Sequence, residues 1–143
     1  MNECQKSDKD VTPNLRTFNN ILNACAYTKG EPKELMSAFR IAVDVINDLR
    51  KSQTLTLNPV SYGLFLRCCT QLMPPSDKRE AVVENIFRKC CNDGQLGSYV
   101  LHELSHAASP ELCTKLLGGD MEDGVNLPME WSRNVKNNRQ KLR

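Results

Sequence analysis

Hydrophobic residues recur along this chain at helical spacing, in stripes that are separated by short polar, proline or glycine breaks. The clearest stripe follows Pro32 and consists of Leu35, Ala38, Phe39, Ala42, Val45, Ile46 and Leu49. Charged residues fill most of the remaining positions, as is typical of a helix that buries one face. The pattern therefore predicts an amphipathic helix from about Pro32 to the polar connector that begins at Ser52.

Weaker stripes of the same kind predict five further helices. The first is expected to begin near Asn14, a residue well suited to capping, and to stop before Gly30. The helices of a second hairpin are expected to break at Pro74-Pro75 and to end at Gly94. A shorter third hairpin is expected within residues 96–118. No segment alternates apolar and polar residues for long enough to predict a strand, so the chain is expected to be all-α.

The first helices of the first two hairpins share a pattern that repeats after 44 residues. The overlay aligns Asn14, Thr17, Phe18, Ile21, Leu22 and Cys25 with Asn58, Ser61, Tyr62, Phe65, Leu66 and Cys69. A fixed period of this size indicates stacked helical units, because one hairpin cannot bury its apolar face alone. We therefore predict an α-α superhelix, or solenoid, of two full helical hairpins plus a short third, followed by an irregular C-terminal tail.

The predicted organisation has three parts: a flexible polar segment over 1–12, helical repeats over 13–118 in units of about 13–58, 59–95 and 96–118, and a tail over 119–143. Within the tail, Leu127, Met129 and Trp131 could fold back over the last hairpin, as the terminal units of solenoids require. The end of the tail is basic and holds Arg133, Lys136, Arg139, Lys141 and Arg143. A run of like charges favours a solvated end over a phosphate-binding arm.

Composition and charge narrow the choices only slightly. The chain has 143 residues, of which 40% are hydrophobic and 25% charged, and this size allows one core but hardly two. The formal charge of +2 is too small to demand a nucleic-acid partner. No apolar run approaches the roughly 18 residues needed to cross a bilayer, so we expect a soluble protein with no membrane partner.

Seven cysteines are present, an odd number, and no two of them form a Cys-x-x-Cys pair. Most lie at apolar positions of the helical patterns, where a thiol fills space as a small hydrophobic group. This distribution predicts reduced thiols in the core and an intracellular compartment. The seven are Cys4, Cys25, Cys68, Cys69, Cys90, Cys91 and Cys113.

The repeated openings, NLRTFNNILNAC at 14–25 and NPVSYGLFLRCC at 58–69, resemble those of pentatricopeptide repeats. The resemblance is clear over residues 13–95 and looser over 96–118. The string LPMEWSRN at 127–134 is similar to the C-terminal end of such repeat proteins in diatoms and related algae. Tetratricopeptide repeats fit less well, because the chain lacks their tryptophan and Leu-Gly pattern.

The resemblance implies recognition of single-stranded RNA, one base per repeat, by side chains of the first helices that face a shared groove. The family reads a base with the residue after the aromatic of the first helix and with another at the end of the repeat. These positions correspond to Asn19 and Asn58, and Asn14 would close a repeat that begins upstream. The residue three before the reader lies against the base faces, and it is Arg16 in the first unit and Val60 in the second.

The chain also departs from the family. Gly63 stands at the reader position of the second unit and has no side chain with which to discriminate bases. The first unit spans 44 residues where the family has about 35, which could shift the groove out of register with RNA. An alternative interpretation of Asn14, Asn19 and Asn58 is that they cap helices or lie exposed at helix starts. The missing reader and the small charge favour a second hypothesis, a helical scaffold that binds protein.

A competing motif, His-Glu-x-x-His, occurs at His102, Glu103 and His106. On a helix this spacing places two imidazoles on one face for zinc and supplies a glutamate as general base. The third ligand of the elongated motif is absent, and no edge strand is predicted to hold a substrate. The repeat pattern places all three residues on the solvent side of a helix whose core face is Leu101, Leu104 and Ala108, so a zinc hydrolase is the least favoured hypothesis.

The expectations combine into a module without enzymatic activity, cofactor or bound metal that contributes to single-stranded RNA binding. Two or three repeats offer few base contacts, so we expect one end of a longer array or a module that works beside a partner protein. By the family resemblance, its role is RNA processing or stability in a mitochondrion or plastid.

Overall fold

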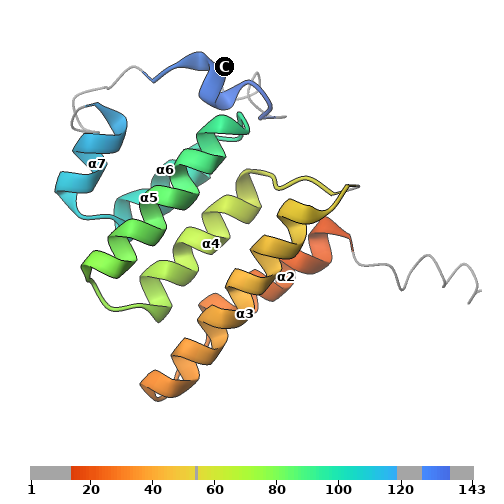
Figure 1. Ribbon diagram of the computed structural model, residues 1–143, viewed down its shortest axis with the longest axis vertical. Coiled ribbons are helices and arrows are strands. Elements are labelled where there is room, and N and C mark those ends of the chain that lie inside the picture. The colour runs from red at the N-terminus through yellow and green to blue at the C-terminus, as the bar shows by residue number, and fades with distance from the viewer. Residues whose placement is uncertain (1–13, 54, 119–126, 136–143) are drawn as a thin grey trace, which may run out of the picture.

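The computed structural model describes residues 14–53, 55–118 and 127–135, and over these ranges it contains helices and no strand (Figure 1). The elements are α2 (Leu15–Ala26), α3 (Pro32–Lys51), α4 (Pro59–Leu72), α5 (Asp77–Asn92), α6 (Ser98–Ala107), α7 (Pro110–Leu117) and the 3-10 turn η2 (Met129–Ser132). The predicted all-α class is confirmed. In the same ranges no helix has the length and apolarity that a membrane span needs. The segment expected to be flexible, 1–12, lies outside the described residues, as do 119–126 and 136–143 of the tail.

Side-chain caps explain where the helices begin. Asn14 caps α2 and Asn58 caps α4, and in each case the side-chain oxygen accepts a hydrogen bond from the backbone N–H three residues later at 2.9 Å. Both caps have φ −116°, with ψ 177° and 178°. Ser76 and Ser109 cap α5 and α7 in the same way. The aligned asparagines therefore occupy equivalent positions of two helices.

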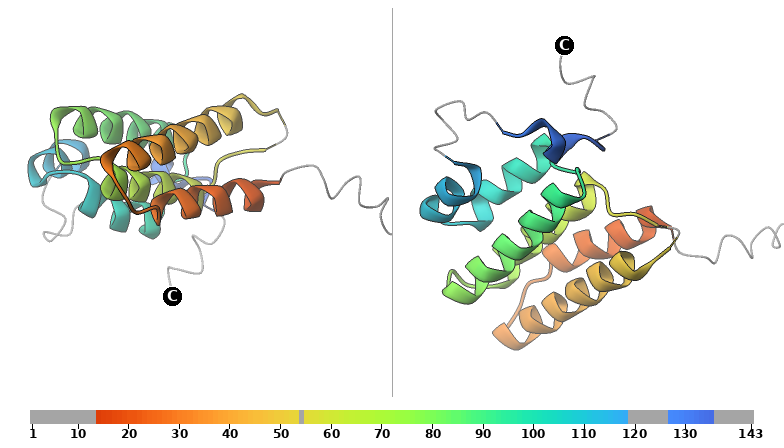
Figure 2. Two further views of the ribbon diagram at one scale, coloured as in Figure 1. Left: turned by 90° about the horizontal axis from the view of Figure 1, so that it is seen from below. Right: turned by 45° about the horizontal axis from the view of Figure 1, so that its top comes forward.

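The helices lie in two layers (Figure 2). One layer holds α2, α4 and α6, with α4 packed between the other two. The second helices of the first two hairpins, α3 and α5, lie on the other side, and α4 also contacts both of them. The short helix α7 packs against α5 and α6. Because α4 touches all four of its neighbours, it forms the centre of the core.

The interior is built from aromatic, aliphatic and thiol groups. Tyr62 is fully buried in α4, and its hydroxyl donates a hydrogen bond to the Asp93 carboxylate at the end of α5. Burial is the main cause that raises the pKa of Tyr62 far above its usual range, and the bond to Asp93 adds to it. All six described cysteines are free thiols, and five of them are buried. The thiols thus serve as core groups, as the helical pattern predicts.

The described part of the tail packs against the end of α5. The Trp131 ring meets Phe87 edge-on, with ring centroids 5.9 Å apart and an interplanar angle of 88°. The Arg133 guanidinium donates to the Asn92 carbonyl at 2.7 Å. Trp131 and Leu127 therefore pack against the core, whereas the expectation that Met129 does so is wrong, since that side chain is 86% exposed. Arg133 is exposed, as expected of a solvated charge, and its guanidinium also donates to carbonyls that a helix end leaves free.

The buried thiols predict a fall in stability at alkaline pH. Cys68, Cys69 and Cys90 are fully buried, and burial raises the pKa of all three, that of Cys69 to about 12. A raised folded-state pKa contributes stability that is complete below the unfolded-state pKa of about 8.5 and is lost as pH rises toward the folded-state value. We expect the free energy of unfolding, from urea titrations with reductant, to fall by about 1 to 2 kcal/mol between about pH 7 and 9. A constant value would contradict this.

Candidate nucleic-acid interface

The two predicted repeat-end residues lie at helix starts, where their oxygens are already engaged. Asn14 is exposed, and Oδ1 accepts from both the backbone N–H and the hydroxyl of Thr17, at 2.9 and 3.0 Å. Asn58 is half-buried, and the Ser61 backbone donates to its Oδ1. The capping interpretation is therefore confirmed for both residues. Capping uses the carbonyl oxygen of each amide and does not occupy its NH₂ group.

Asn19 lies where α2 crosses the start of α4. It is half-buried, and its Oδ1 is 2.7 Å from the Ser61 hydroxyl, which donates to it. The same hydroxyl lies 2.9 Å from Oδ1 of Asn58. Two of the expected readers, Asn19 and Asn58, are thus brought together through a buried serine of the second unit. Within the described ranges no partner engages the Asn19 NH₂ group, which leaves two donors for an external acceptor.

Arg16 and Val60 occupy equivalent positions, each two residues after its cap. Arg16 is exposed, and Val60 has 45% of its surface exposed. Tyr99 stands two residues after Gly97, the cap of α6, and so takes the same position in the third hairpin. Val60 and Tyr99 both line a recess of about 790 Å³ at the N-terminal ends of α4 and α6. A cation, an aliphatic side chain and an aromatic ring therefore occupy the same position, two residues after the cap, on three neighbouring helices.

Gly63 does not open onto a groove, and that expectation is wrong. The residue is buried, and the Tyr99 ring of α6 lies over its Cα. A Cβ at this position would lie 2.3 Å from Cδ2 and 2.4 Å from Cε2 of the ring, far inside normal contact. The absent side chain thus permits α6 to pack closely on α4. Gly63 therefore offers neither a side chain nor an exposed surface at the expected reader position.

A mixed aromatic and charged cluster spans the same three helices and was not anticipated from the sequence. The Arg67 guanidinium carbon of α4 lies 5.0 Å from the ring centroid of Tyr27, and its NH2 donates to the Tyr27 hydroxyl at 3.2 Å. On the other side, its NH1 is 3.7 Å from Oε2 of Glu103 in α6. Tyr27 is 56% exposed, so a planar ring backed by a guanidinium faces solvent. The signal in the sequence that could have revealed this cluster was Arg67, the single cation among the apolar residues of α4.

The histidine pair lies on a different face from the glutamate of the motif. His102 and His106 are exposed, with ring centroids 4.7 Å apart and an interplanar angle of 78°. Glu103, expected on the solvent side, is only 4% exposed and joins the buried face of α6 together with Val100 and Leu104. This correction follows from the helical period, which groups positions 100, 103, 104 and 107. In the described parts of the chain no three His, Cys, Asp or Glu residues gather as a metal site would need.

Comparison of the chain with models of protein families, with curated proteins and with solved structures gives no match.

Proposed function

We propose that this chain is a pentatricopeptide-type module that binds single-stranded RNA on the layer formed by α2, α4 and α6. In this proposal the hairpins are successive units of an α-α superhelix, and the chain is one end of a longer array. The repeated caps Asn14 and Asn58 support this, since they set two first helices in the same register. From the family resemblance we also propose a role in RNA processing or stability in a mitochondrion or plastid.

The observation that carries the proposal is the position of Asn19. Its oxygen is fixed by Ser61 while its NH₂ group is left without a partner in the described ranges, so the amide is oriented before any base arrives. Arg16 and Val60 flank it at the positions where bases would stack, because a guanidinium plane or an aliphatic surface can cover a base face. Asn14 and Asn58 supply further amide donors beside the bound strand. Tyr27 on Arg67 adds a second exposed surface for stacking.

Fluorescence anisotropy with labelled single-stranded RNA of each base composition tests the proposal. We expect binding that weakens as salt rises, because phosphate contacts release counterions. Asn19→Asp keeps the oxygen that accepts from Ser61 but removes both NH₂ donors, so it should change the base preference and weaken binding about tenfold, or 1.4 kcal/mol. Asn19→Ala should lose the preference altogether. Asn85→Ala, in the opposite layer, is the matched control and should bind as the parent does.

A chain that binds no RNA at low salt would overturn this function. That result would favour the second candidate, a helical scaffold for protein partners. The observation that supports the scaffold is an apolar groove in the opposite layer, between α3 and α5. The two candidates use different faces of the molecule, so variants on one face leave the other intact.

A further inference from the structure

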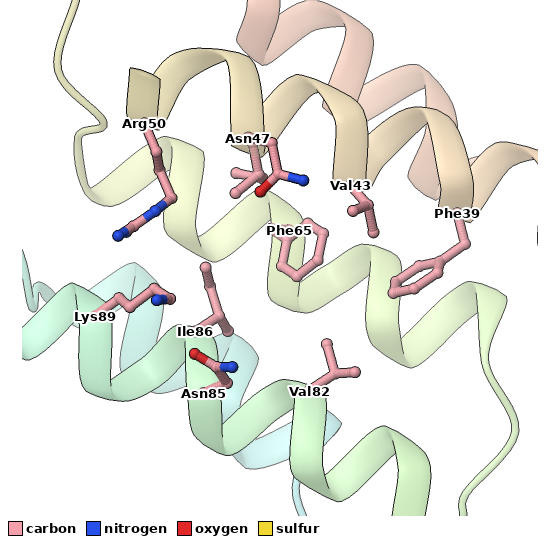
Figure 3. Close-up of a pocket in the computed structure, with 10 residues that line it drawn as sticks. Phe39, Val43, Asn47, Arg50, Phe65, Val82, Asn85, Ile86 and Lys89 are labelled. Carbon is pink, nitrogen blue, oxygen red and sulfur yellow. The ribbon is translucent and has the colours of Figure 1, made fainter. Parts of the chain in front are cut away.

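The second helices of the first two hairpins leave a groove between them. Its walls are α3 and α5, and its floor is α4 (Figure 3). The groove has a volume of about 260 Å³. Its apolar lining consists of Phe39, Val43, Ile46, Phe65, Val82 and Ile86. The Phe39 and Phe65 rings lie 5.7 Å apart at an angle of 34°, with Phe39 at one end of the groove and Phe65 on its floor (Figure 3).

The apolar stripe of α3 is wider than the part of it that is buried in the core. Residues such as Ala42 and Leu49 are buried against α2 and α4, whereas Phe39 and Val43, on the adjoining side of the stripe, are only half-buried. Val82 of α5 is half-buried across the groove. Two parallel helices thus present side chains at helical spacing toward a shared and partly open space. A surface with an apolar centre and polar edges is the usual form of a binding groove.

The polar edge of the groove is cationic at one end. Arg50 and Lys89 lie at the C-terminal ends of α3 and α5, and Asn47 and Asn85 lie beside the middle of the groove (Figure 3). Among the described residues, no carboxylate lines it. Neither cation forms an ion pair or a hydrogen bond with another residue in the described ranges. Asp93, which borders a neighbouring recess with Arg50, already accepts a hydrogen bond from Tyr62.

We propose that this groove binds an amphipathic helix of a partner protein that carries acidic residues in its first turn. The apolar face of that helix would lie over the half-buried Phe39, Val43 and Val82, and its carboxylates would meet Arg50 and Lys89. The stripe from Phe39 to Arg50 is about 17 Å long at 1.5 Å per residue, so about three turns of the partner fill it. Carboxylates in a first turn also stabilise the helix that carries them. Because that first turn would lie at the C-terminal ends of α3 and α5, the partner helix runs antiparallel to both.

A helix fits this groove better than an extended segment does. The side chains at i, i+4, i+7 and i+11 of α3 and at i, i+4 and i+7 of α5 form two ridges, between which the ridge of a third helix can settle. An extended peptide that binds by strand addition needs unpaired backbone groups from an edge strand, and the described ranges contain no strand. The inference does not rest on RNA binding, and it gives the scaffold alternative a specific occupant.

The test uses the full chain and two fluorescent stapled peptides of about twelve residues, each with apolar side chains at i, i+3, i+4 and i+7. One peptide carries two glutamates in its first turn, and the other carries two lysines there. We expect saturable anisotropy only with the acidic peptide. Its addition should shift the side-chain amide resonances of Asn47 and Asn85 in nitrogen-edited spectra, because both amides line the groove.

Matched variants separate the groove from general electrostatics. Arg50→Glu is expected to lower the affinity for the acidic peptide at least tenfold. Lys51→Glu makes the same charge change in the same last turn of α3 but outside the groove, and it should lower that affinity less than twofold. Val43→Glu should abolish binding, whereas Ile41→Glu, at a site that is already 50% exposed, should not. The parent chain is not expected to bind the lysine peptide, so binding of that peptide by Arg50→Glu would confirm the charge contact.

Several results would overturn the inference. Binding of both peptides alike would show that the groove has no charge preference. An equal loss in Arg50→Glu and Lys51→Glu would place the contact outside the groove. Self-association of the peptide-free chain, abolished by Val43→Glu in sedimentation, would assign the groove to a second copy, and competition by RNA would assign it to nucleic acid. Unchanged RNA binding in Val43→Glu keeps the failure of this inference distinct from that of the proposed function.

Discussion

Arg79→Met is expected to lower the free energy of unfolding by about 3 kcal/mol, because it removes charged hydrogen bonds from the interior. Arg79 is buried near the start of α5. Its Nε donates to the Ala107 carbonyl at 3.2 Å, and its NH1 donates to the carbonyls of Met73 and Thr70 at 2.9 and 3.4 Å. These carbonyls belong to the C-terminal ends of α6 and α4. One guanidinium therefore satisfies the free carbonyls and the negative ends of two helix dipoles.

Methionine retains the aliphatic volume of arginine but has no donor, so three carbonyls lose their partner. The loss is a large share of the 5 to 15 kcal/mol, roughly, that stabilise an ordinary domain. Urea unfolding followed by circular dichroism measures it. Arg79→Lys should fall between parent and Arg79→Met, because a single ammonium cannot span both helix ends.

Arg88→Met is the matched control for Arg79→Met. Arg88 lies on the same helix, but it is exposed and forms an i,i+4 ion pair with Glu84 at 2.8 Å. Pairs of this kind contribute little in solvent, so the urea midpoint should stay almost unchanged. If both variants unfolded at the parent midpoint, the buried guanidinium would contribute no net stability.

Gly63→Ala is expected to cost about 2 kcal/mol, although alanine normally stabilises a helix by about 1 kcal/mol relative to glycine. The sign reverses because the added methyl group would lie 2.3 Å from the Tyr99 ring, and the packing of α4 on α6 would have to open. The measurement is again the urea midpoint.

A double-mutant cycle with Tyr99→Ala identifies the cause. Removing the ring first leaves space for the methyl group, so Gly63→Ala should become neutral or stabilising in that background. A cost that persisted without the ring would show that the close approach of Tyr99 is not its origin. The cycle thus separates ring packing from any effect of backbone conformation.

The sequence predicted the helices well, because caps and breaks act locally. Asn14, Asn58, Ser76 and Ser109 each begin a helix with the hydrogen bond that their side chains favour, and no distant residue is needed for that. The stripe after Pro32 likewise became α3, since its period is fixed by the helix itself.

The sequence did not reveal which side of each apolar stripe packs against a neighbouring helix. Glu103 and Arg79 have charges that favour solvent, and both are buried because residues of other helices engage them, Arg67 in one case and backbone carbonyls in the other. From the sequence, Gly63 was expected at a base-reading position that lacks a side chain. The sequence could not show that the Tyr99 ring, which comes from another hairpin, fills the space beside it. The groove between α3 and α5 depends on the spacing of two hairpins, which the stripe of one helix does not encode.

The contact between Asn19 and Ser61 has a consequence for every substitution at position 19. Asn19 orients its amide by binding a hydroxyl that also belongs to the cap of α4. A replacement at position 19 that cannot accept from Ser61 would therefore disturb the joint between two hairpins. A new side chain at position 19 has to keep an oxygen for Ser61, as aspartate does, or position 61 has to change with it.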